Sequence, residues 1–125
     1  METEGKKNWY IVDGWLPSKT QQNSADLEGH EAVMILNCNG TNAKVYIDIF
    51  FADQDPIEDI EIEVEAKRVK CIRMDHPEEI GGYNLNREHQ YSLRLRSEKN
   101  IIVQYGRMDI TQPNLAYIGF IGYSE

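Results

Sequence analysis

The chain has 125 residues, the usual size of one domain, and 41% of them are hydrophobic. Its 21 acidic residues outnumber 13 basic ones, and the resulting formal charge of −8 disfavours binding to nucleic acid phosphates or to anionic lipid surfaces. No apolar run approaches the roughly 20 residues that a transmembrane helix requires. Residues 1–8 are polar and lack the apolar core of a secretory signal. We therefore expect a flexible N-terminus over 1–8 and a single cytoplasmic domain over 9–125.

Short stretches in which hydrophobic and polar residues alternate predict β-strands along most of the chain. In chain order these stretches are 9–12, 33–36, 44–51, 57–66, 68–74, 91–97, 101–103 and 115–123. The clearest is 57–66, where Ile60, Ile62 and Val64 alternate with acidic residues, as in a strand with one buried face. The pattern predicts an all-β fold, an antiparallel β-sandwich similar to a jelly roll, with seven to eight strands.

The segment 30–52 is expected to be the centre of this sandwich. Two apolar strands flank Asn39-Gly40, a dipeptide that favours a tight turn because it reaches positive φ at low cost. We therefore expect these strands to pair as a hairpin whose apolar face is covered by other strands. The polar segment 19–29 predicts a loop at one rim, and 78–90 predicts a second long loop with a short helical turn at 86–89.

Polar side chains cluster where three of the apolar strands begin or end: Asp13; His30 and Glu31; Gln104, Arg107 and Asp109. An arginine offers a rigid fork of donors that suits a carboxylate or vicinal hydroxyls, and the carboxylates and amide can accept or bridge. Such a mixture suits a polyol or a small acid. The alternative is a structural network in which Arg107 pairs with Asp109 or Glu31, and His30 caps a strand.

Several motifs recur in a specific order and spacing along the chain. They are Trp9-x-x-x-Asp13-Gly14-x-x-Pro17, then His30-Glu31 followed by Ile35-Leu36-Asn37, then Pro56, Ala66-x-Arg68 and Val103-Gln104-x-x-Arg107-x-Asp109. Together they resemble the sensory rhodopsin transducer family over roughly residues 9–116. The resemblance implies a small cytosolic β-sandwich, akin to carbohydrate-binding and jelly-roll modules, that assembles as a homotetramer.

The resemblance also implies a set of ligand-binding residues and a function. Carried over position by position, the set is Asp13, His30, Glu31, Asn37, Arg68, Gln104 and Arg107. The family is named for a member that couples to a membrane photoreceptor, whereas many relatives are regarded as domains that bind small molecules such as sugars. We therefore expect a soluble, non-enzymatic domain that binds a small polar ligand, such as a carbohydrate derivative, and relays its occupancy to a partner. The chain departs from the family in loops 18–29 and 76–90 and after Tyr117, so a light-signalling role does not follow.

Two other functions stay open at this point. One is an adaptor that docks the cytoplasmic tail of a membrane receptor, and the other is a hydrolase or isomerase acting on sugars, with Glu31 and Asp13 as general acid and base. We expect no cofactor and no metal, because metal sites on jelly rolls usually use two or three histidines and His76 and His89 lack such spacing. The acidic residues of 53–65 predict a solvated strand face instead of a calcium site.

Overall fold

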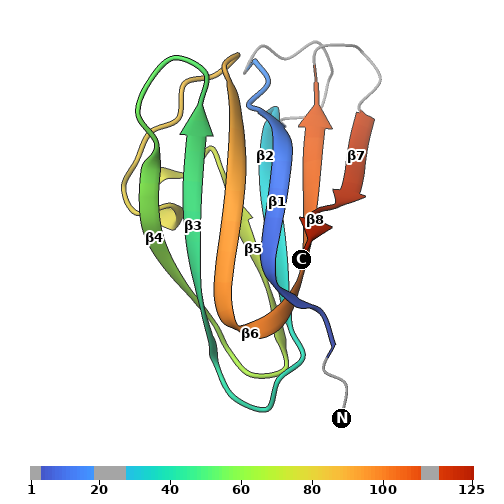
Figure 1. The fold of residues 1–125 in the computed structure, drawn as a ribbon. Helices are drawn as coiled ribbons and strands as arrows, with labels where there is room; N and C mark the ends of the chain where they lie inside the picture. Colours follow the sequence, from blue (N-terminus) through green and yellow to red (C-terminus); the bar gives the residue numbers. More distant parts are fainter. Residues whose placement is uncertain (1–3, 19–27, 111–115) are drawn as a thin grey trace.

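The computed structural model describes residues 4–18, 28–110 and 116–125, which form an antiparallel all-β fold (Figure 1). Its strands are β1 (Lys6–Trp15), β2 (His30–Asn37), β3 (Ala43–Phe51), β4 (Ile57–Val64), β5 (Arg68–Arg73), β6 (Gln90–Asp109), β7 (Ala116–Ile121) and β8 (Tyr123–Ser124). The predicted fold class is confirmed, and every predicted strand overlaps an observed one. Among the described residues the one helical element is the short 3₁₀ turn η1 (Pro77–Glu79), and residues 86–89, where a helical turn was predicted, are not helical.

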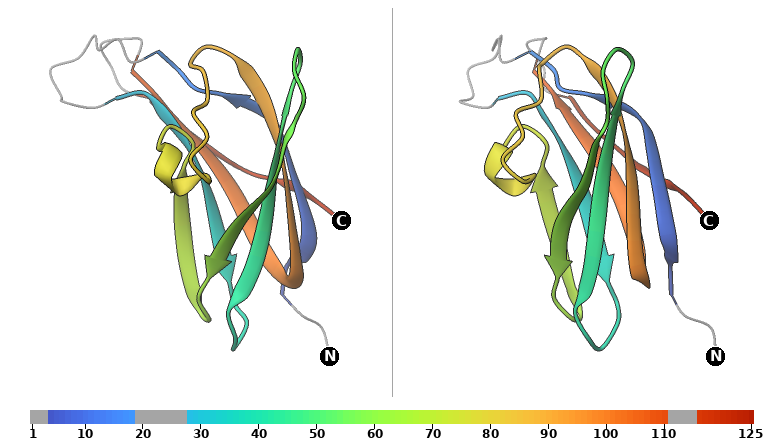
Figure 2. Two further views of the ribbon diagram at one scale, coloured as in Figure 1. Left: turned by 90° about the vertical axis from the view of Figure 1, so that its left-hand side faces the viewer. Right: turned by 60° about the vertical axis from the view of Figure 1, so that its left-hand side comes forward.

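The long strand β6 belongs to both layers of the sandwich. Its first half pairs with β3 and β1, in a layer with the order β4-β3-β6-β1-β8. Its second half pairs with β2 and β7, and β5 completes that layer beside β2. Figure 1 shows β6 curving from one layer into the other, and Figure 2 shows the two layers from the side. The stretches 91–97 and 101–103, predicted as separate strands, are therefore parts of one strand.

The predicted hairpin around Asn39-Gly40 is wrong. β2 pairs with β5 and β6, whereas β3 pairs with β4 and β6, so the connection between β2 and β3 crosses from one layer to the other. Neither Asn39 nor Gly40 adopts the positive φ that a tight two-residue hairpin turn uses. The next connection, from β4 to β5, also crosses between the layers and turns through Lys67 at a φ of 58°.

The hydrophobic core lies between the two layers. Val33 and Ile35 of β2 and Ile47 and Ile49 of β3, which were predicted to need cover, are completely buried. Full burial of one such side chain contributes roughly 1.5–3 kcal/mol, so these residues are a main source of stability. In β4, Ile60, Ile62 and Val64 are buried and the acidic residues between them are exposed, as their alternation predicted.

The candidate site lies at the end of the sandwich where β1 ends and β2 begins, which we call the open end. Because β6 doubles back between the layers, its first residues and its last residues lie at this same end, together with the end of β1 and the start of β2 (Figure 1). β1 begins at Lys6, within the segment 1–8 that was expected to be flexible, and most of the loop expected at 19–29 lies outside the described residues. No helix in the described parts of the chain has the length and apolar character needed to cross a membrane.

Candidate ligand-binding site

A buried carboxylate lies inside the open end of the sandwich. Glu31 of β2 is 0% exposed. Its Oε1 accepts hydrogen bonds from the Trp15 backbone N–H at 2.7 Å and from the hydroxyls of Tyr91 at 2.6 Å and Tyr105 at 2.7 Å. Its Oε2 accepts a hydrogen bond from Nε of Arg107. A charge buried in this way is tolerated because it is both paired and hydrogen-bonded.

The course of β6 brings these partners together. Tyr91 lies in its first half and Tyr105 in its second half, and Arg107 lies directly opposite Glu31 in the β2–β6 register. The two tyrosine hydroxyl oxygens also contact each other, so one of the two protons can be shared between Glu31 and the neighbouring hydroxyl. Burial and the negative charge of Glu31 raise the pKa of Tyr91 well above its usual value, and burial and the neighbouring Tyr91 raise the pKa of Tyr105 in the same direction. Both hydroxyls therefore remain protonated donors at neutral pH.

Arg107 connects this buried network to the surface. Its side chain is 26% exposed, and its Nη2 lies 3.8 Å from Oδ1 of Asp13 at the end of β1. Burial alone would lower the pKa of Arg107, but the hydrogen bond to Glu31 and the charge of that residue raise it, so the guanidinium stays charged. On its outer side is a groove of about 250 Å³ lined by Trp15, Pro17, Ser18, Glu88, Arg107 and Asp109.

A second hollow, of about 230 Å³, opens at the same end of the sandwich. Its apolar lining comes from Phe51, Ala52, Ile57, Leu85 and Tyr91, and its polar lining from Asp53, Gln54, Asn84, Asn86, His89 and Gln90. Tyr91 connects it to the first site, because its ring lines this hollow while its hydroxyl bonds to Glu31. Both volumes are below the roughly 300 Å³ at which pockets for drug-sized molecules begin, so each hollow suits a smaller ligand.

Three of the seven residues in the expected ligand-binding set meet at the open end. These are Asp13, Glu31 and Arg107. His30 is next to Glu31 in β2 but lies on the opposite face of the strand, with its Nδ1 2.9 Å from the carbonyl oxygen of Glu28.

The other members of the set lie elsewhere. Asn37 is buried at the far end of β2, opposite Arg68 in the β2–β5 register, and the Arg68 side chain is exposed. Gln104 is exposed on β6, where it lies on the outer face of its layer beside β7. The seven residues therefore do not converge on a single cavity.

Asn37 is fully engaged in holding the crossing between the layers. Its Nδ2 donates to the carbonyl oxygens of Thr41 and Val64, each at 3.0 Å, and to that of Glu65 at 3.2 Å. Its Oδ1 accepts from the backbone N–H and from the side chain of Asn39. This side chain therefore ties the β2–β3 connection to the end of β4.

The sequence interpretation missed Tyr91, Tyr105 and Trp15 as partners of Glu31. In the predicted strand 91–97, Tyr91 alternates in phase with Leu93 and Leu95, and a buried tyrosine hydroxyl needs a hydrogen-bond partner. This requirement could have indicated that Tyr91 bonds to a buried polar group, and a buried acidic residue is one such group. The sequence did not show which acid, because the bend in β6 decides it.

Two antiparallel layers joined by one bent strand, with a polar groove at their open end, define a small β-sandwich domain. A family model described as Anabaena sensory rhodopsin transducer matches residues 4–124, so the chain belongs to the Anabaena sensory rhodopsin transducer family. The resemblance drawn from the sequence motifs is thus confirmed, and by family the chain is a transducer-like domain.

Two solved structures are similar to this chain. The crystal structure of Thermotoga maritima 1070 has a TM-score of 0.85 and 24% identity, over 98% of this chain and 97% of that one, and shows the same fold. The structure of the Anabaena sensory rhodopsin transducer has a TM-score of 0.73 and 26% identity, over 86% of this chain and 92% of that one. None of the curated proteins matches this chain.

Proposed function

We propose that this chain is a non-enzymatic transducer domain that binds a small polyhydroxylated ligand, such as a carbohydrate derivative, in the groove beside Arg107 and Trp15. The observation that carries the proposal is the position of Arg107. The buried carboxylate of Glu31 accepts a hydrogen bond from this guanidinium on its inner side. On its outer side, the Arg107 side chain lines the groove. A guanidinium that is already fixed loses little conformational entropy when it binds a ligand.

The composition of the groove favours a polyol over a simple anion. Arg107 shares the lining with the carboxylate residues Glu88 and Asp109, and Asp13 lies 3.8 Å from its Nη2. Hydroxyl groups can donate to carboxylates and accept from a guanidinium, whereas an anion would be repelled by the carboxylates. Trp15, 38% exposed, adds an aromatic surface on which a sugar ring can stack.

The environment of Glu31 supports a binding role over catalysis. Glu31 was the candidate general base or acid of the enzymatic alternative. It is completely buried, and both of its carboxylate oxygens already accept hydrogen bonds. A general base must reach the proton that it removes, and here Arg107 lies between Glu31 and the groove.

Calorimetric titration with a panel of monosaccharides, sugar alcohols and sugar acids tests this proposal. Trp15→Ala is the most informative variant, because Glu31 is bonded to the backbone of Trp15 and that bond survives the substitution. We expect Arg107→Ala to abolish binding and Trp15→Ala to weaken it about tenfold. Tyr83→Ala, which removes an exposed aromatic residue outside the groove, should bind as the wild type does. Equal affinity in all four proteins, or no binding to any member of the panel, would contradict the proposal.

Docking of protein partners is a second candidate function, and the outer face of the layer β5-β2-β6-β7 favours it. This face exposes hydrophobic side chains that are each at least 37% accessible: Leu36, Val69, Tyr117 and Ile121. β7 lies at the edge of the layer and has no charged residue, although exposed edges are usually protected by charges. We propose that this face mediates assembly into a homotetramer in the cytoplasm. One similar structure is named as a sensory rhodopsin transducer, so we propose a membrane receptor's cytoplasmic tail as the further partner.

Light scattering coupled to size-exclusion chromatography tests the assembly. We expect a wild-type mass of four chains and a smaller mass for Val69→Lys, because a lysine ammonium is costly to bury in an apolar contact. Val12→Lys is the matched control, since Val12 is equally exposed but lies on β1 in the other layer. A monomeric wild type, or an unchanged mass for Val69→Lys, would refute assembly through this face.

A further inference from the structure

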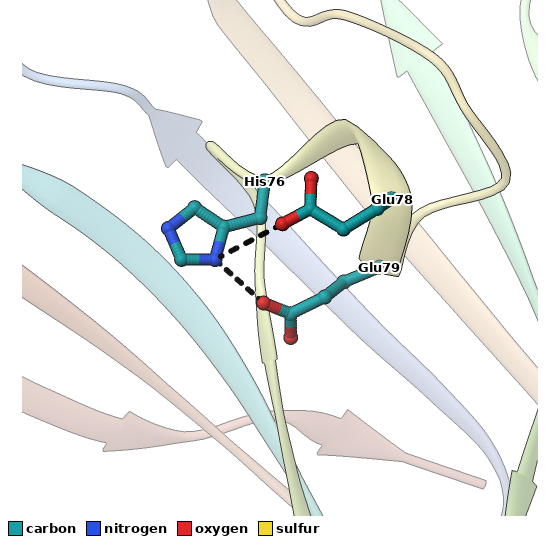
Figure 3. A group of neighbouring side chains, drawn as sticks. All are labelled: His76, Glu78 and Glu79. Carbon is teal, nitrogen blue, oxygen red and sulfur yellow. Dashed lines mark hydrogen bonds and ion pairs between the residues drawn. The ribbon is translucent and has the colours of Figure 1, made fainter.

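The sequence led us to expect no metal, but from the structure we propose that His76, Glu78 and Glu79 form a binding site for a divalent transition-metal ion such as Zn²⁺. The three residues follow β5 and extend over the turn η1 (Figure 3). One ligand atom from each residue lies within 4.8 Å of the other two. Within the described ranges 4–18, 28–110 and 116–125, this is the one group of three or more possible metal ligands that lie so close together. The site shares no residue with the groove beside Arg107, so its test is independent of the proposed sugar binding.

The distances in the cluster are close to those of a coordination sphere. Nδ1 of His76 lies 2.6 Å from Oε2 of Glu79 and 3.7 Å from Oε1 of Glu78. Ligand atoms around a tetrahedral zinc ion, with bonds of about 2.0–2.1 Å, are about 3.4 Å apart. Small rotations of these partly exposed side chains therefore place all three atoms around one ion. A fourth position would remain open to water.

The electrostatics of the cluster favour a cation. Two carboxylates approach one imidazole nitrogen, which can satisfy only one of them with a hydrogen bond. Glu79 makes that bond at 2.6 Å, whereas the nearest Glu78 oxygen lies 3.7 Å from the same nitrogen, beyond hydrogen-bond distance. Figure 3 marks both contacts. A dication between the three side chains offsets the negative charge of both carboxylates. An imidazole nitrogen among the ligands selects zinc and similar transition metals over magnesium or calcium.

Neighbouring groups hold the ligands in this orientation. The Arg73 backbone N–H donates to Oε1 of Glu79 at 3.1 Å, which leaves Oε2 directed towards His76. On the other side of the imidazole, Nε2 lies 4.0 Å from Oδ2 of Asp75. Asp75 is itself buried and held by two hydrogen bonds from Arg73, at 2.7 and 2.8 Å. At this distance Asp75 does not hydrogen-bond to the ring, but its carboxylate adds a further negative charge near the imidazole.

Zinc titration of the metal-stripped, untagged full chain by calorimetry tests the proposal. We expect one ion per chain and affinities at least tenfold lower for His76→Ala and Glu78→Gln. The Glu78 side chain is 72% exposed and forms an ion pair with His76, so Glu78→Gln tests the site with little effect on the fold. His89→Ala is the control, because His89 is also an exposed loop histidine but its Nδ1 faces the Arg87 carbonyl oxygen. Absence of zinc binding at one equivalent, or equal affinity in wild type, His76→Ala and Glu78→Gln, would overturn the proposal.

Discussion

Tyr105 and Glu31 lie on neighbouring strands and share a hydrogen bond of 2.7 Å inside the open end of the sandwich. The same Glu31 oxygen accepts the hydroxyl of Tyr91, which comes from the other half of β6 and thus from the other layer. One carboxylate therefore joins the two layers where they open. The groove beside Arg107 depends on this junction, because the guanidinium is positioned by the same carboxylate.

Replacing Tyr105 with Phe should destabilise the protein by about 1–3 kcal/mol, because Glu31 loses one donor while remaining buried. The phenyl ring fills the same space, so the effect reports on the hydroxyl alone. Urea unfolding, with an unchanged dependence on denaturant, measures it. The control Tyr123→Phe changes a hydroxyl on an exposed tyrosine and should alter the free energy of unfolding by less than about 0.5 kcal/mol. Equal stability of Tyr105→Phe and wild type would show that Glu31 does not need this donor.

Gly14 is the position on β1 that leaves room for the Tyr91 ring. A Cβ atom at Gly14 would lie 2.4 Å from Cε2 of Tyr91, and the hydrogen bond to Glu31 prevents that ring from moving aside. We expect Gly14→Ala to cost about 1–3 kcal/mol and to lower the melting temperature by several degrees. Gly40→Ala adds a methyl group in open space and should melt like the wild type. The explanation fails if both alanine variants melt at the same temperature.

Asp48 should make the stability of the protein depend on pH in the acid range. Asp48 is completely buried, and Arg94 and Arg96 both donate to its carboxylate. Burial alone would raise the pKa of Asp48, but hydrogen bonds from Arg96, the Asp59 backbone N–H and Arg94 outweigh burial and lower the pKa from 3.8 to about 2.

Because this pKa is lower in the folded state than in the unfolded state, the stabilisation is fully present above about pH 5. It is lost as the pH falls through 3.8 towards about 2, and amounts to roughly 2 kcal/mol. Urea unfolding at a series of pH values measures it. Asp48→Asn should be less stable at neutral pH and should lose less stability on acidification than the wild type. Parallel pH profiles of the two proteins would exclude Asp48 as the source.

Asn37 belongs to the expected ligand-binding set, but its contacts predict a structural effect. Its side chain donates to three carbonyl oxygens across the layers, so Asn37→Ala removes three hydrogen bonds, one of them buried and two partly buried. We expect a loss of more than about 2 kcal/mol in thermal or urea unfolding. Arg68→Ala, directly opposite in the β2–β5 register but exposed, should change stability by less than about 0.5 kcal/mol. Comparable losses in the two variants would contradict this assignment.

The strands and their buried faces could be predicted from the sequence because strand periodicity is a local property. The alternation in β4 and the apolar run Val33–Leu36 correctly identified strands and core residues. Pairing was harder, since the Asn39-Gly40 signal is also local but the partners of β2 and β3 are distant in the chain. The same limit explains why β6 was divided into two shorter strands.

Glu31 and Asn37 show where prediction of the site reached its limit. Both are buried polar residues on the inward face of β2, and both lie at an end of its apolar run. In the sequence they are equivalent candidates. In the structure Glu31 bonds to Arg107, which lines the groove at the open end. Asn37 lies at the opposite end, where it hydrogen-bonds to the Val64 carbonyl oxygen beside the connection between the layers.

The sequence by itself determined the all-β class, most strand positions, the inward faces and the family, because these depend on residue order and on alternation with a period of two. Only the tertiary structure decided which polar residues meet. The curvature of β6 brings Tyr91 and Tyr105 onto one carboxylate and separates Asn37, Arg68 and Gln104 from it. Contacts of this kind join residues that are far apart in the chain, and they follow from how the strands are layered rather than from any local pattern.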